Sequence, residues 1–110
     1  MSYIVLDLEW NQAMSSNASV FNRLPIHLSG EIIQIGAVKL DDDFCPAEEF
    51  QSDVRPIYFR SMHYKVKKLT GIDKERLSHG DTFPTVFEHF REWCGEDPVF
   101  VTWGLSLIHI

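Results

Sequence analysis

The chain has 110 residues, of which 45% are apolar and fourteen are aromatic; this suits one small domain with its own core and excludes a disordered composition. The net charge of −6 argues against a simple electrostatic nucleic-acid binder, and no apolar run is long enough to span a membrane. The first ten residues lack a basic stretch and include Asp7, so we expect no signal peptide. Cys45 and Cys94 lack metal-type spacing and fit a reducing cytoplasm, where we expect the protein to be.

The first expected element is a strand at residues 3–8, because this apolar run is too short for a helix. Alternation along a strand places Asp7 and Glu9 on one face. Both faces begin apolar, which predicts a central strand covered on both sides. Residues 11–29 are rich in Asn and Ser and have no steady period, so they predict a long loop.

Two more strands are expected at residues 31–42 and 48–56. The link between these two strands is short, and we expect them to form an antiparallel meander with the first strand. Gly36 lies within the second strand and indicates either a bulge or a close approach of another backbone.

The second half of the chain predicts mainly helix. Residues 63–71 fit a short helix that ends at Gly71, and Asp73 can cap a second short helix after it. Apolar residues recur with helical spacing over residues 83–94, which predicts an amphipathic helix. A final apolar strand is expected at residues 98–103.

Asp7 and Glu9 are the sharpest chemical signal in the sequence. Two carboxylates at the end of a buried strand repel each other unless a proton or a cation lies between them. Oxygen ligands of this kind suit Mg²⁺ or Mn²⁺, and a pair of such ions can support phosphodiester cleavage. A solvated strand end is the plain alternative. A phosphatase with Asp7 as nucleophile is a rival, but position 11 is Asn and position 9 is Glu.

The basic residues are concentrated in one segment. Residues 55–76 hold seven of the ten basic residues and two of the sixteen acidic ones, so a basic segment is attached to an acidic body. Basic side chains can hold phosphates while aromatic rings stack on bases, and we therefore expect Tyr64, Lys67 and Lys68 to contact a nucleic-acid substrate. A solvated loop and helix is the alternative interpretation.

Four segments in order carry a resemblance to a known family: VLDLEWN, EIIQIGAVKL, HYKVKKLTGI and FVTWG. Together they resemble the DEDD-type 3′→5′ exonucleases of the ribonuclease H-like superfamily, in the group of the polymerase proofreading subunits and ribonuclease T. The TWG turn is similar to that of the histone-mRNA and small-RNA exonucleases and of the bacterial sporulation-inhibitor-type exonucleases. The match covers residues 3–104 apart from the 11–29 loop.

The resemblance implies an α/β fold with a mixed sheet, in which the first three strands are antiparallel and the last is parallel, with flanking helices. It implies hydrolysis at the 3′ end of single-stranded RNA or DNA, with two Mg²⁺ or Mn²⁺ ions held by four acidic residues and a His as general base. Asp7 and Glu9 match the first motif of the family. Trp10 follows that motif, where the family places a residue near the terminal nucleotide, so Trp10 would stack on it or serve as a core or rim residue.

The second motif of the family requires an Asp within about three positions of TWG, but Leu105, Ser106 and Leu107 occupy them. The third motif, a His followed by an Asp, has no residues left to form it. We therefore expect residues 1–104 to be the N-terminal part of a single exonuclease domain that is inactive alone. The alternative is a non-catalytic domain of the same fold that binds nucleic acid or protein.

The final hexapeptide, LSLIHI, is an unpatterned apolar end. It is also the translation of CTG TCT CTT ATA CAC ATC, the transposase mosaic end used as a sequencing adapter. We therefore expect residues 105–110 to be a non-native tail.

Overall fold

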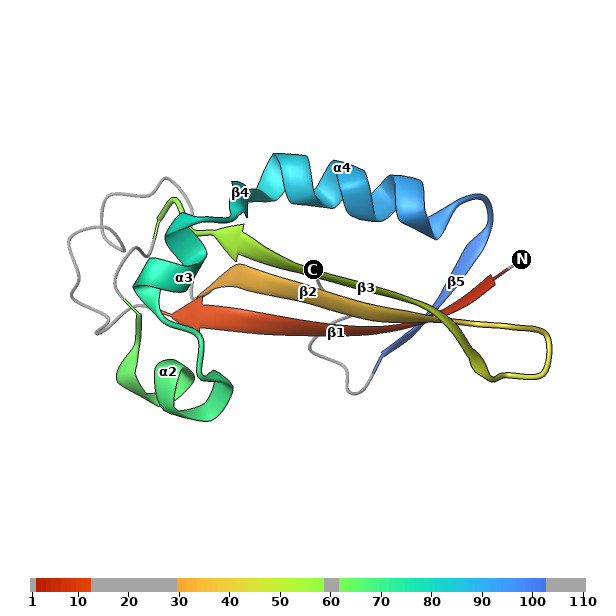
Figure 1. Ribbon diagram of the computed structural model, residues 1–110, viewed down its shortest axis with the longest axis horizontal. Helices are drawn as coiled ribbons and strands as arrows, with labels where there is room; N and C mark the ends of the chain where they lie inside the picture. Colours follow the sequence, from red (N-terminus) through yellow and green to blue (C-terminus); the bar gives the residue numbers. More distant parts are fainter. Residues whose placement is uncertain (1, 13–29, 59–61, 103–110) are drawn as a thin grey trace.

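The computed structural model describes residues 2–12, 30–58 and 62–102. Three long strands form its centre: β1 (Ser2–Gln12), β2 (Gly30–Leu40) and β3 (Pro46–Arg55). β2 pairs antiparallel with both β1 and β3, which confirms the predicted meander. β1 and β3 therefore end, and β2 begins, at the same end of the sheet (Figure 1).

The remaining elements complete a mixed sheet and flank it. They are α2 (Tyr64–Thr70), α3 (Lys74–Ser78), β4 (Asp81–Thr82), α4 (Phe83–Cys94) and β5 (Pro98–Thr102). The strand order is β4-β3-β2-β1-β5, with β5 parallel to β1 and β4 parallel to β3. The α/β class, the three antiparallel strands and the parallel final strand are thus confirmed. None of the helices in the described ranges is long and apolar enough to cross a membrane.

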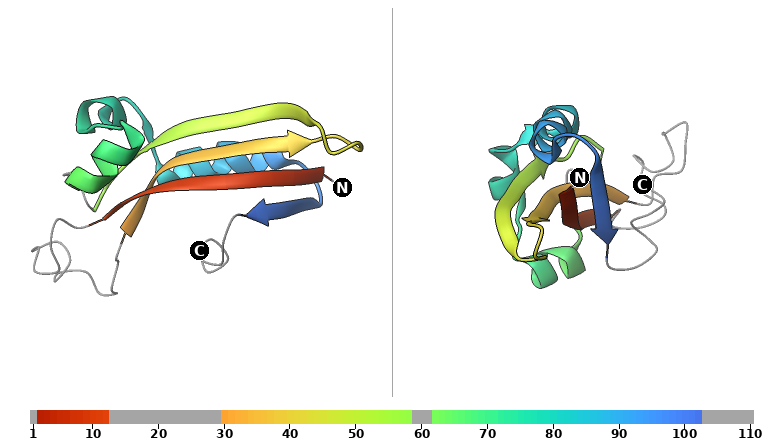
Figure 2. Two further views of the ribbon diagram at one scale, coloured as in Figure 1. Left: turned by 90° about the horizontal axis from the view of Figure 1, so that it is seen from below. Right: turned by 90° about the vertical axis from the view of Figure 1, so that its right-hand side faces the viewer.

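One face of the sheet is covered by α4, and α2 lies on the opposite side near the end of β1 (Figure 2). The main core lies beneath α4. Its buried members come from β1, β2, β3 and α4, namely Ile4, Ile32, Ile35, Ala37, Val54, Val86, Phe90 and Cys94. The helical spacing of residues 83–94 therefore predicted the buried positions Val86, Phe90 and Cys94 correctly, whereas Phe83 and Phe87 of the same stripe are exposed. Cys94 belongs to this core, whereas Cys45 is exposed.

A smaller core lies on the other side of the sheet, under α2 and α3. Ile33, Ile72 and Leu77 are its buried members. Ile33 reaches that side because the pairing of β1 with β2 shifts between Glu9 and Trp10, which leaves one extra residue in β2. Because of the bulge, Ile32 shares the main core with Ile35, three positions away, while Ile33 enters the smaller core.

Three expectations differ from the structure. The bulge does not lie at Gly36, which pairs regularly with Asp7 and leaves only ordinary contact distance for a side chain. β1 continues to Gln12, so the predicted loop begins later than residue 11. β4 was not predicted, because its two residues, Asp81–Thr82, have no period and depend on pairing with the distant β3.

The predicted caps of the two short helices are confirmed. Gly71 ends α2 in the left-handed conformation, with a φ of 74°, and its N–H bonds back to Lys67. Asp73 begins α3, and its carboxylate accepts a bond of 2.8 Å from the N–H of Arg76. These caps fix a tight path between the two helices, so Ile72 between them enters the smaller core.

A candidate half-site for metal-dependent nucleic-acid chemistry

Asp7 and Glu9 lie on the face of β1 that α4 does not cover. Their neighbours Ile4, Leu6 and Leu8 alternate with them and contact the core under α4. The Asp7 side chain is exposed, whereas Glu9 is half-buried. Asp7 faces Gly36 across the sheet, so no side chain from β2 stands directly beside its carboxylate.

The electrostatics of this pair favour a cation. Burial raises the pKa of Glu9 above its usual value, and the negative charge of Asp7 raises it further. A divalent ion between the two carboxylates would relieve that repulsion and suits their oxygen donors. Within residues 2–12, 30–58 and 62–102, no group of three or more potential ligands surrounds them. In the described part of the chain these two carboxylates could hold a cation, and their oxygen donors fit Mg²⁺ or Mn²⁺.

The carboxyl end of the neighbouring strand β5 lies close to Asp7 along the sheet. β5 runs parallel to β1, and its last residue, Thr102, lies opposite Leu6. The carboxyl end of β5 is therefore one position short of Asp7 along the sheet. Parallel strands place their carboxyl ends at a common edge, where ligand sites form. Leu105, Ser106 and Leu107, which occupy the expected second motif, lie outside the described residues.

Trp10 does not share a face with the two carboxylates. Its Cα partner is Ile32 of the main core, and its side chain, 36% exposed, lines an apolar pocket with Tyr58 and Phe83. The bulge and the alternation of β1 both direct Trp10 to the side of α4. The sequence left two roles open for Trp10, stacking on the terminal nucleotide or a core or rim position. The structure places it on the side of the main core and does not bring it together with Asp7 and Glu9.

The predicted contacts of the basic segment lie on α2. Tyr64, Lys67 and Lys68 have helical i, i+3 and i+4 spacing and are all exposed, with Tyr64 at 63%. Val66, in contrast, packs against the smaller core. Because α2 lies on the side of the sheet away from α4 (Figure 2), these three residues are on the same side as Asp7 and Glu9.

The position of α2 is fixed by Asn11, which sequence reasoning missed. Asn11 is fully buried, and its Oδ1 accepts a bond of 2.9 Å from the backbone N–H of His63. His63 in turn caps α2, since its Nδ1 accepts a bond of 3.2 Å from the N–H of Lys65. The end of β1 therefore holds the start of α2. No local pattern reveals this role, because the bond spans 52 positions.

One residue of the basic segment has a structural partner instead. Both nitrogens Nε and Nη2 of Arg76 bond the carboxylate of Asp53, at 2.7 and 3.0 Å. Gln34, the β2 partner of Glu9, donates to the same carboxylate at 3.1 Å. The pKa of Arg76 is raised by this hydrogen-bonded pairing. Arg76 therefore joins α3 to β3 and is not a free phosphate contact.

Comparisons with known proteins agree with the fold. A sequence profile of the ribonuclease T-type exonucleases matches residues 4–108. No curated protein matches the sequence significantly. Among solved structures, the chain is similar to the nuclease domain of 3′hExo, a DEDDh family member, bound to rAMP, with 22% identity and a TM-score of 0.74. That match covers 94% of this chain and 52% of the other.

Two further structures share the fold. Cell-death related nuclease 4 (CRN-4) is 24% identical with a TM-score of 0.70, and the match covers 92% of this chain and 34% of that one. E. coli exonuclease I in complex with a dA16 oligonucleotide is 11% identical with a TM-score of 0.65, covering 93% and 20%. The chain thus spans about half or less of the length of these solved structures.

Proposed function

Because this chain belongs to the ribonuclease T-type exonuclease family, we propose that it carries the first half of the metal site of a 3′→5′ exonuclease acting on single-stranded RNA or DNA. The observation that carries the proposal is the placement of Asp7 and Glu9 on one open face, beside the carboxyl end of β5. A nuclease is what the family supports. The polarity, the strand preference and the metal are the proposed part.

In this proposal Asp7 and Glu9 hold one side of a two-metal centre with Mg²⁺ or Mn²⁺. When bound, such ions activate a water and stabilise the leaving oxygen. The chain itself contributes two carboxylates, the open space above Gly36, and an exposed α2 with Lys67, Lys68 and Tyr64 on the same side. The lysines would hold strand phosphates, and the tyrosine ring would stack on a base.

We propose further that residues 1–104 are part of one exonuclease domain and that these residues alone do not turn over substrate. The described residues supply two acids where the family expects four. Losing members of a cooperating catalytic set removes most of the rate. We also propose that residues 105–110, which lie outside the described ranges, are translated adapter, and resequencing of the genomic locus tests this.

The experiment has two arms. The 110-residue chain is incubated with Mn²⁺ and a 3′-labelled single-stranded oligonucleotide, and we expect no mononucleotide release. Turnover that Asp7→Ala abolishes would contradict the inactivity of this chain. In a parent protein whose gene continues past TWG with an Asp, we expect release from the 3′ end that Asp7→Ala abolishes.

A non-catalytic domain of the same fold, binding nucleic acid or protein, is the second candidate. The incomplete ligand set among the described residues favours it. The genomic codons after Gly104 separate the two candidates. An Asp there, followed later by a His and an Asp on one helix, supports the enzyme, whereas natural termination at Ile110 supports the binding domain.

A further inference from the structure

Two adjacent pockets lie at the end of the sheet where β1 and β3 finish, the first beside α3 and β4 and the second beside the start of α4. The first, of about 380 Å³, is lined by Arg55, Pro56, Ile57, Lys74, Ser78 and Thr82. The second, of about 370 Å³, is lined mainly by apolar and aromatic residues, including Trp10, Ile57, Tyr58 and Phe83. They share Ile57, and Thr82 and Phe83 are neighbours at the start of α4. We call the two pockets together the end groove.

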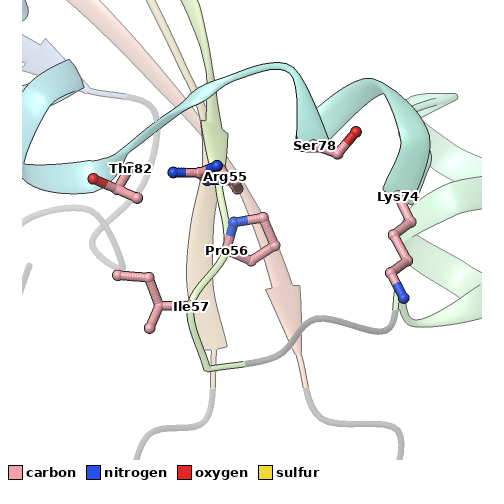
Figure 3. Close-up of a pocket in the computed structure, with 6 residues that line it drawn as sticks. All are labelled: Arg55, Pro56, Ile57, Lys74, Ser78 and Thr82. Atoms are coloured by element: carbon pink, nitrogen blue, oxygen red, sulfur yellow. The ribbon is translucent and has the colours of Figure 1, made fainter.

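The first pocket is cationic. Figure 3 shows Arg55 and Thr82 on one side of Pro56, with the Arg55 guanidinium directed toward Thr82, and Lys74 and Ser78 on the other side. Pairing of β3 with β4 places Arg55 opposite Thr82. Within the described ranges neither Arg55 nor Lys74 forms a salt bridge, whereas Arg76 nearby is bonded to Asp53. Two cations with open side chains suit an anionic group such as a phosphate.

The second pocket is aromatic and partly open to solvent. Trp10 is 36% exposed, Tyr58 43% and Phe83 37%. The ridge that separates the pockets is held by Glu31, whose carboxylate accepts bonds from the backbone N–H groups of Ile57, at 2.7 Å, and of Tyr58, at 3.1 Å. Glu31 itself lines this pocket, and its carboxylate is bonded to the protein backbone. Exposed rings on a fixed ridge suit the faces of nucleobases.

We infer that the end groove is a second binding surface for single-stranded nucleic acid, with separate phosphates at Arg55 and at Lys74, whose charged ends lie on opposite sides of Pro56 (Figure 3), and a base against Trp10, Tyr58 or Phe83. Cationic and aromatic pockets side by side match the two parts of one nucleotide unit. The aromatic pocket lies on the opposite side of the sheet from Asp7 and Glu9, at the end where β1 finishes.

This inference rests on the proposed nucleic-acid substrate but not on catalysis, so binding is measured with metal removed by EDTA. The probe is a short 5′-fluorescein-labelled oligouridylate, and its anisotropy is titrated with the 110-residue chain at several salt concentrations. We expect the Arg55→Ala/Lys74→Ala double variant to flatten the slope of log K against log salt by about 1.4, which is two contacts at about 0.7 each. Tyr58→Ala should weaken binding roughly fivefold or more.

The matched control is Arg91→Ala, which removes an exposed cation from the far end of α4, where Arg91 is bonded to Glu88. It should leave the salt slope near that of the unaltered chain. An independent readout is the indole N–H resonance of Trp10, assigned with Trp10→Phe, which should move when the oligonucleotide is added in EDTA. Circular dichroism confirms that each variant is folded.

Three outcomes overturn the inference. One is a salt slope that the double variant leaves unchanged, and another is a Trp10 resonance that does not move at saturation. The third is that AMP binds at Trp10 while the affinity for the oligonucleotide is the same with and without the Arg55 and Lys74 side chains. The groove would then be a site for free nucleotides. Asp7→Ala should leave groove binding intact. A complete parent protein that loses nuclease activity in Asp7→Ala supports the proposed function. If the groove of that parent binds no oligonucleotide, this inference alone is refuted.

Discussion

The two faces of β1 differ in nearly every physical property although they alternate residue by residue. Toward α4, Ile4 is fully buried and packs with Ile35 and Phe90. On the other face, Val5 is 40% exposed, Asp7 is exposed, and burial and mutual repulsion raise the pKa of Glu9. The first face lowers the free energy of the folded chain, and the second keeps charged groups together at a cost in stability. Such a cost is typical of functional sites.

The difference between the two faces of β1 predicts that substitutions on the face toward α4 lower stability the most. Phe90 is 6% exposed, and its ring lies 5.3 Å from that of Phe50 and 6.2 Å from that of Phe100. Phe90→Ala should lower the free energy of unfolding by about 3–5 kcal/mol, because it removes buried apolar surface and leaves a cavity. Urea unfolding followed by circular dichroism measures this loss.

Phe87 supplies the control for that prediction. It lies on the same helix but is 44% exposed, and it stacks on Phe83 rather than on the sheet. Phe87→Ala should cost much less than Phe90→Ala. Equal losses at the two positions would mean that α4 does not bury one face against the sheet, and the difference between the two faces of β1 would lose its basis.

A smaller effect is expected where the open face meets α2. Asn11→Ala removes the acceptor of the His63 N–H, and the loss of a buried hydrogen-bond partner should cost about 1–3 kcal/mol. Hydrogen exchange of the His63 amide should become faster at the same time. Leu69→Ala on the exposed side of α2, where Leu69 is 85% exposed, should change stability by less than about 0.5 kcal/mol. An unchanged His63 exchange rate in Asn11→Ala would show that β1 does not hold α2.

The sequence predicts the face of β1 toward α4 better than the open face that carries Asp7 and Glu9. Local periodicity predicts α4 and the three long strands, because a buried helix stripe or strand face repeats apolar residues at a fixed short spacing. The pairing of Asp7 with Glu9 on one face also followed from alternation alone. The bulge at Ile33 did not, since it depends on the register between β1 and β2 rather than on either strand.

Long-range partners explain the other differences. From the sequence, Arg76 is one of several cations in the basic segment. In the structure its guanidinium bonds Asp53, which lies 23 positions earlier in the chain. Only the family resemblance suggested a place for Trp10 near the terminal nucleotide, whereas strand alternation already places it on the face opposite Asp7 and Glu9. The end groove joins residues from β1, β2, β3, β4, α3 and α4, and no short window of sequence contains them together.

The smallest predicted effect concerns Glu9, whose substitution should raise the stability of the chain, whereas the substitutions above lower it. The pKa of Glu9 is raised in the folded chain, so its ionised form opposes folding. Its contribution to stability is fully present below the ordinary pKa of 4.5 and is lost as the pH rises through the higher folded-state pKa. Glu9→Gln removes this loss. We expect its melting temperature to exceed that of the unaltered chain by a few degrees at neutral pH, with no difference near pH 4.

Glu49→Gln is the matched control, because it removes one exposed carboxylate from the same face of the sheet but from β3, two strands away. It should not reproduce the pH-dependent gain. Added Mg²⁺ should raise the melting temperature of the unaltered chain, since a cation relieves the repulsion between Asp7 and Glu9, and should leave that of Glu9→Gln nearly unchanged. If Glu9→Gln melted at or below the temperature of the unaltered chain at every pH, the carboxylate pair would not be held against repulsion. The open face of β1 would then be a solvated surface, with no cost in stability for a bound metal to offset.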